Sequence, residues 1–174
     1  MLNRIVLFFV FLGIFSASFA IGAEVQVSEE DSAIILEELE SLIDEIDAVG
    51  IFGHNTLLAL PMFIPGFGIA WGAFAAFSTG MAFSVLQDAN PMLANIPSLT
   101  ILFMSPFGLM EIAAYSIAMS RSYMIVHKMI KRMPIRPDLR VIGLEVAILV
   151  GLLLAGGFLE YYFIENLPTD MPQI

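Results

Sequence analysis

The chain has 174 residues, of which 59% are hydrophobic and 14% are charged, and its mean hydropathy is +0.88. A soluble domain carries about 25% charged residues, so this composition excludes an ordinary soluble fold and predicts an all-α, polytopic membrane protein that lies in the lipid bilayer. The chain has no cysteine and a net charge of −10, with most acids in residues 24–47 and most basic residues in 121–140. This pattern excludes thiol chemistry and disulfides, and it argues against nucleic-acid binding.

Residues 1–23 are almost entirely apolar after Arg4. Ser18-Phe19-Ala20 resembles a small-x-small cleavage site, which is typical of a signal peptide. The apolar length is also close to the roughly 20 residues that cross a bilayer as a helix. We favour a retained signal anchor or first transmembrane helix, and a cleaved signal peptide is the alternative.

Residues 24–50 are the one segment with a soluble character. Apolar residues recur there at helical spacing between acids, which predicts an acidic amphipathic helix, and Ser28 followed by acids suits its N-terminus. This helix could pack against the remainder of the protein, or its surface could dock a partner or bind cations. The apolar stripe consists of Leu36, Leu39, Leu42, Ile43 and Ile46.

The remaining chain, residues 51–174, is predicted to be a membrane helical domain. Residues 48–87 contain no Lys, Arg, Asp or Glu, and as one helix they would be about 60 Å long, roughly twice the hydrocarbon thickness. Pro61 and the sequence Pro65-Gly66-Phe67-Gly68 interrupt this stretch. We therefore expect two membrane segments, or one segment and a re-entrant half, joined near Pro65.

A turn is predicted at residues 88–97, from its Asn and Pro residues. Residues 98–105 are apolar but too short to span alone, and a helix can begin at Pro106 and run to about Val126. A basic loop follows, which we place at 121–140, and a last helix is predicted over 141–163.

The positive-inside rule places loop 121–140 and Arg4 in the cytoplasm. The acidic segment and the C-terminus are then extracytoplasmic, and the chain must cross an odd number of times between residues 47 and 128. Three crossings fit, which favours about five membrane segments in all.

Small residues recur every fourth position in two predicted helices. Residues at this spacing share a helix face and let helices approach closely in lipid, although chance in a Gly- and Ala-rich chain is the alternative. The two sets are Gly68, Gly72, Ala76 and Gly80, and Gly143, Ala147, Gly151 and Ala155.

Glu111 is the acid that stands out inside a predicted membrane helix. A carboxylate there should face the protein interior and find a partner or stay protonated, and its candidate partners are His54, Asn55 and amides near Gly108. The favoured interpretation is that Glu111 makes a structural hydrogen bond. The alternatives are that it belongs to a proton or ion site, or that it takes part in catalysis. One His and one Glu do not make a metal site, and we expect no metal, cofactor or catalytic constellation.

Four stretches together resemble the stage II sporulation protein M family of membrane proteins, over roughly residues 50–125. These stretches are Phe52-Gly53-His54-Asn55, Pro65-Gly66-Phe67-Gly68, Ser78-Thr79-Gly80, and Ser105-Pro106-Phe107-Gly108-Leu109-Met110-Glu111-Ile112-Ala113-Ala114. The positions that match the family pattern are Asn55, Gly66, Gly80, Pro106, Gly108 and Glu111.

Two positions depart from the family pattern: Phe107 stands where the family has His, and Thr79 where it has Asn. The resemblance implies a polytopic fold with a cytoplasmic N-terminus and an extracytoplasmic C-terminus. For the sporulation members it also implies a scaffold within a membrane complex that remodels the cell wall.

Three classes of function follow from the sequence. The favoured one is a non-catalytic scaffold or accessory subunit that assembles with other membrane proteins or with itself. The second is a transporter or channel component that uses Glu111 and the broken helices. The third, a membrane-embedded enzyme, rests only on His54 and Glu111.

Overall fold

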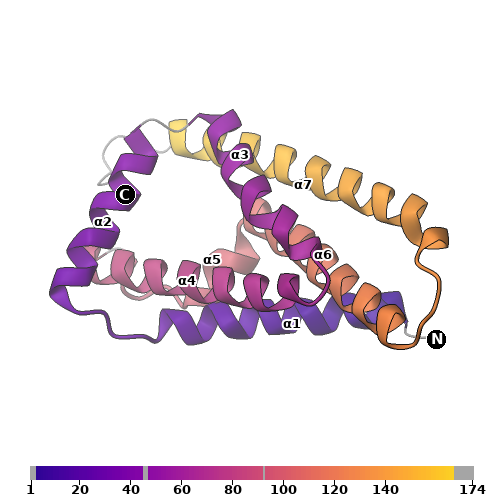
Figure 1. The fold of residues 1–174 in the computed structure, drawn as a ribbon. Helices are drawn as coiled ribbons and strands as arrows, with labels where there is room; N and C mark the ends of the chain where they lie inside the picture. The colour runs from indigo at the N-terminus through magenta and orange to yellow at the C-terminus, as the bar shows by residue number, and fades with distance from the viewer. Residues whose placement is uncertain (1–2, 45–46, 92, 167–174) are drawn as a thin grey trace.

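The structure is a computed structural model that describes residues 3–44, 47–91 and 93–166, without the side chains of residues 40–44. The prediction for the C-terminus falls on residues 167–174, outside these ranges. Every regular element in the described ranges is a helix, as predicted (Figure 1). The order is α1 (Arg4–Ala23), α2 (Glu29–Asp44), α3 (Ala48–Ala59), η1 (Leu60–Phe63), α4 (Phe67–Ala89), α5 (Ser98–Met104), α6 (Pro106–Ile130), η2 (Arg136–Asp138) and α7 (Leu139–Glu165).

Three helical stretches are long and apolar enough to cross a membrane, namely α1, α4 and residues Arg136–Glu165. A fourth candidate is the pair α5 and α6, which passes the same test together but is bent by 89°. The apolar stretch Ala48–Phe63 is shorter than these. The fold is therefore all-helical with three or four helices of membrane length, which is consistent with a membrane protein.

The helices α1 and α4 lie side by side and run in the same direction (Figure 1). Their closest approach is made by glycines: a Cβ on Gly22 would lie 2.0 Å from the carbonyl oxygen of Phe77, and one on Gly80 would lie 2.0 Å from that of Phe19. Side chains at these positions would force the backbones apart, as expected for small residues at helix contacts in lipid. Gly80 was one of the predicted packing residues.

The predicted interruption near Pro65 is present as a tight turn between η1 and α4. Gly66 has φ of +81°, a left-handed conformation that residues with a Cβ rarely adopt. A Cβ on Gly68 would lie 1.9 Å from the carbonyl oxygen of Met62. Ser122 of α6 fastens the turn, because its hydroxyl donates to the carbonyl of Ile64 (2.7 Å) and accepts from the amide of Gly66 (3.1 Å).

The bend between α5 and α6 lies at Ser105, and α6 begins at Pro106 as predicted. The Ser105 hydroxyl accepts from the amide of Gly108 at 3.1 Å and donates to the carbonyl of Ile101 at 2.7 Å. It therefore satisfies a free donor of α6, and it shares the carbonyl of Ile101 with the backbone amide of Ser105. The helix α6 continues to Ile130, beyond the predicted end near Val126. Arg121 consequently lies inside α6, and its predicted place in the basic loop is wrong.

The two small-residue faces have different outcomes. Gly68, Gly72, Ala76 and Gly80 of α4 are all buried, and a Cβ on Gly72 would lie 2.5 Å from the sulfur of Met119. The structure corrects the second set: Gly143, Ala147, Gly151 and Ala155 are exposed, and nothing lies within 4 Å of a Cβ built on Gly143 or Gly151. Four-residue spacing identifies a face of a helix, but it does not say whether that face meets another helix.

The buried face of α7 consists of other residues: Glu145, Leu149, Leu153, Gly156 and Gly157. A Cβ on Gly157 would lie 3.0 Å from the amide nitrogen of Phe52 and 3.1 Å from the carbonyl oxygen of Ala48. Gly157 thus lets α3 approach the backbone of α7, whereas a Cβ on Gly156 would face α6, 3.7 Å from Cβ of Met110.

Candidate functional site

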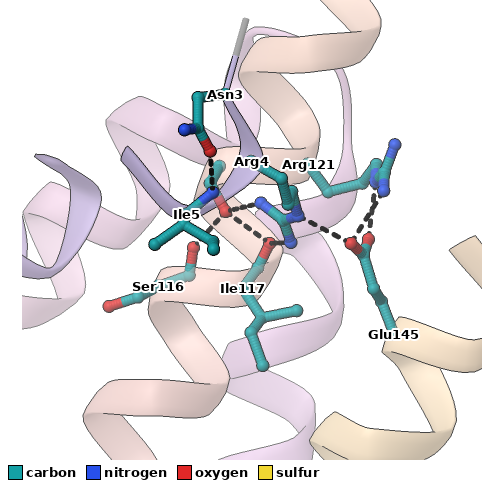
Figure 2. A network of polar contacts seen from close by, with 8 residues as sticks. Asn3, Arg4, Ile5, Ser116, Ile117, Arg121 and Glu145 are labelled. Carbon is teal, nitrogen blue, oxygen red and sulfur yellow. Dashed lines mark hydrogen bonds and ion pairs between the residues drawn. The ribbon is translucent and has the colours of Figure 1, made fainter. Parts of the chain in front are cut away.

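An ion-pair cluster joins the starts of α1 and α7 to the C-terminal half of α6, and Figure 2 shows it from close by. Glu145 accepts two hydrogen bonds from Arg121, at 2.5 Å from Nε and 2.7 Å from Nη2. Its Oε1 also accepts from Nε of Arg4 at 2.8 Å. One carboxylate therefore holds two guanidinium groups from different helices.

The cluster is largely removed from solvent. The side chain of Arg121 is 3% exposed and that of Glu145 is 10% exposed, whereas Arg4, nearer the chain end, is 29% exposed. Arg4 also donates to the hydroxyl of Ser120 and, at 3.2 Å, to the carbonyl of Ile117. The planar five-donor guanidinium suits such a divided role, and the contacts fix the positions of α1, α6 and α7 relative to one another.

Sequence analysis missed this cluster because it assigned Arg121 to a loop and singled out Glu111 among the acids in the apolar helices. The sequence does contain a sign of this cluster, because one charged residue interrupts each of two apolar stretches. Arg121 follows Ser120 in the first stretch, and Glu145 lies near the start of the last predicted helix. Opposite charges on adjacent helices of a membrane protein are expected to pair.

The second polar group is the pair formed by Asn55 and Glu111. Asn55 is 8% exposed, and its Nδ2 donates to Oε1 of Glu111 at 2.6 Å. Of the three predicted partners of Glu111, the structure brings Asn55 to it. The Gly108 amide donates to Ser105 instead. His54 is exposed at its position on α3, and within the described residues it makes no hydrogen bond to Glu111.

Glu111 lines a cavity of about 300 Å³ enclosed by α1, α2, α3, α4, α5, α6 and α7. Most of its wall is apolar, and the polar side chains on it include His54, Asn55, Tyr115 and Glu160. Glu160 of α7 lines the same cavity as Glu111 and Tyr115. The structure thus places a second acid, which the sequence analysis did not single out, beside the first.

The other motif residues shape the backbone. Pro65, Gly66 and Gly68 form the turn before α4, Pro106 and Gly108 belong to the first turn of α6, and Gly80 packs against α1. The ring of Phe107 packs 6.1 Å from that of Phe163. Thr79 donates its hydroxyl to the carbonyl of Ala75. Phe107 and Thr79 therefore make contacts that are typical of residues in helix packing.

No group of three or more His, Asp or Glu side chains with metal-binding geometry is found in the described part of the chain. Comparisons with known proteins identify no relative: no protein-family model, no curated protein and no solved structure matches this sequence.

Proposed function

We propose that this chain is a multi-pass membrane scaffold or accessory subunit without catalytic activity of its own, similar in role to members of the stage II sporulation protein M family. The single observation that carries the proposal is that the strongest polar contacts inside the helical bundle join helices to one another. Glu145 joins α7 to α1 and α6, and Ser122 joins α6 to the turn before α4. Polar groups that bind one another between helices stabilise the arrangement of the helices, which is the role of a structural subunit.

The arrangement of the helices supports five crossings. Arg4 contacts Ser120 and Glu145, and the turn at Gly66 contacts Ser122. The start of α1, the turn before α4, the end of α6 and the start of α7 thus gather at one end of the bundle, on the right in Figure 1. Because the other basic residues follow at the same end, we infer that this end is cytoplasmic. The stretch Ala48–Phe63 then crosses beside α6, protected by other helices along part of its length.

The acidic helix α2 lies at the opposite end, which we infer to be extracytoplasmic. Its acids Glu29, Glu30, Asp31 and Glu37 are exposed, and they are available to a partner. We propose that this acidic surface helps to dock a second membrane protein subunit or another copy of the chain, with a basic patch as its counterpart.

Co-purification from native membranes in mild detergent, followed by mass spectrometry, tests this proposal. We expect a stoichiometric membrane partner whose retention weakens when Glu29, Glu30 and Glu37 are changed to Gln, with Asp88→Asn as a control at an exposed acid near the end of α4. A chain that is monomeric and free of partners in mild detergent and in native nanodiscs contradicts the scaffold role.

A transporter or channel component is the second candidate, and the cavity beside Glu111 and Glu160 favours it. Broken helices next to an intramembrane acid are typical of transport sites. Flux of protons or monovalent cations through reconstituted vesicles, lost in Glu111→Gln, would support transport over the scaffold role.

A further inference from the structure

The cavity beside Glu111 has the composition of a ligand site. Its volume of about 300 Å³ is at the lower end of the range of small-molecule pockets, roughly 300–1,000 Å³, and it is much larger than the share of about 30 Å³ that one water occupies. It is too large for a bare metal ion and suits a small organic molecule.

The charge of the lining points to a cation. Glu111 and Glu160 both line the cavity, and neither Lys nor Arg is among the described residues that line it. Asn55 donates to one oxygen of Glu111, whereas the side chain of Glu160 makes no hydrogen bond within the described part of the chain. Two ionised carboxylates that line one small cavity repel each other, and a cation between them would relieve that repulsion.

The apolar part of the lining points to an organic cation. Phe15 and Tyr115 stand next to each other on the wall, with ring centroids 5.3 Å apart, and Phe19 lines the cavity with them. Aromatic faces attract cations, most strongly at sites removed from water. An apolar body can in turn pack against Leu58 and Ile112 of the same wall.

We propose that this cavity binds a small organic cation, a protonated amine with an apolar body, and that its charge lies between Glu111 and Glu160. The inference stands independently of the scaffold role, because a structural subunit and a transporter could both hold such a ligand.

A second hollow of about 410 Å³ adjoins the cavity on the α2 side. It shares Leu39, His54 and Thr79 with the cavity, and it also reaches Glu38 of α2. We infer that a cation enters from this side, where Glu38 adds negative charge to the approach.

The test uses the full chain in nanodiscs of zwitterionic lipid, with phenethylamine as the probe. Its amine is protonated at neutral pH, since alkyl ammonium groups titrate near a pKa of about 10. Phenethyl alcohol and phenylacetate have the same ring and chain length but no positive charge. Binding is measured by thermal unfolding and by the fluorescence of Trp71, the single tryptophan, whose indole donates to the carbonyl of Leu58 on the cavity wall.

We expect phenethylamine to raise the unfolding midpoint and change Trp71 fluorescence with a Kd of about 1 mM or tighter, whereas the alcohol and the acid do neither. Glu160→Gln should weaken binding about tenfold or more, and Glu160→Asp should retain most of it. Glu165→Gln is the matched control, because Glu165 lies on the same helix and does not line the cavity.

Three results overturn the proposal. One is equal binding of phenethylamine and phenethyl alcohol, which would show a merely apolar cavity. Another is full binding by Glu160→Gln and by Glu111→Gln, each checked for unchanged helicity and unfolding midpoint in the absence of probe. The third is no response to phenethylamine, butylamine or tetramethylammonium at concentrations of about 10 mM, tenfold above the expected Kd. Loss of partners in co-purification does not affect this measurement, so the two proposals fail separately.

Discussion

Glu145 of α7 and Arg121 of α6 form a two-pronged ion pair, in which Nε and Nη2 of the arginine lie 2.5 Å and 2.7 Å from the two carboxylate oxygens. The two residues are separated by the whole connection between α6 and α7, and Arg4 of α1 binds the same carboxylate from another direction.

Glu145→Ala should destabilise the protein strongly, because it leaves the buried guanidinium of Arg121 without a counter-charge. Removing one partner of a buried pair typically costs about 3–5 kcal/mol. Thermal unfolding in detergent measures the effect, with Glu165→Ala as the control at an acid exposed at the end of α7. The double change Arg121→Met with Glu145→Leu should recover part of the loss, since the buried guanidinium of Arg121 is then gone and only the more exposed Arg4 loses its counter-charge. A wild-type midpoint for Glu145→Ala would show that the cluster is not a structural joint.

Gly80→Leu should lower the unfolding midpoint, because a Cβ at this position already lies 2.0 Å from the carbonyl oxygen of Phe19. The backbones of α1 and α4 would have to separate, with a loss of about 1–3 kcal/mol or more from overpacking. Gly151→Leu is the matched control, since nothing lies within 4 Å of a Cβ there. If both changes lower the unfolding midpoint of the monomer equally, the face of α7 that holds Gly151 is packed against another element, which would contradict the prediction.

Glu111→Gln should leave folding and partner assembly close to wild type, because the amide oxygen of Gln can still accept from Nδ2 of Asn55. Glu111→Leu should destabilise by about 1–3 kcal/mol, since it leaves the nearly buried Asn55 donor unpaired. Unfolding midpoints and co-purification yields of the two variants provide the comparison. The structural role of Glu111 is contradicted if Glu111→Leu is as stable as wild type, and transport becomes the better interpretation if Glu111→Gln assembles normally but abolishes cation flux.

The proposed topology can be tested with single cysteines, because the chain has none of its own. A cysteine at Lys131 should be protected from a membrane-impermeant thiol reagent in intact cells, whereas one at Ser32 or Gln173 should be labelled. This follows from the proposed cytoplasmic location of the basic end of the bundle. Labelling at position 131 without labelling at the other two positions would reverse the orientation.

The features of the fold that depend on local chemistry can be predicted from the amino-acid sequence alone. Composition predicted helices suited to lipid, proline and glycine predicted the break near Pro65, and Pro106 predicted where α6 begins. These features follow from backbone conformations that neighbouring residues allow or forbid, so they can be recognised without knowing what packs against what.

Which helix faces meet and which charges pair becomes visible in the tertiary structure and could not be predicted from the sequence. The stripe that contains Gly143 and Gly151 has the same spacing as the stripe that contains Gly72, yet the first is exposed and the second is buried. Arg121 and Glu145 are partners because α6 and α7 pack antiparallel, which brings the C-terminal half of α6 beside the start of α7. Side-chain spacing defines a face within one helix, whereas its partner depends on the direction and depth of every other helix, and these are fixed by contacts between residues far apart in the chain.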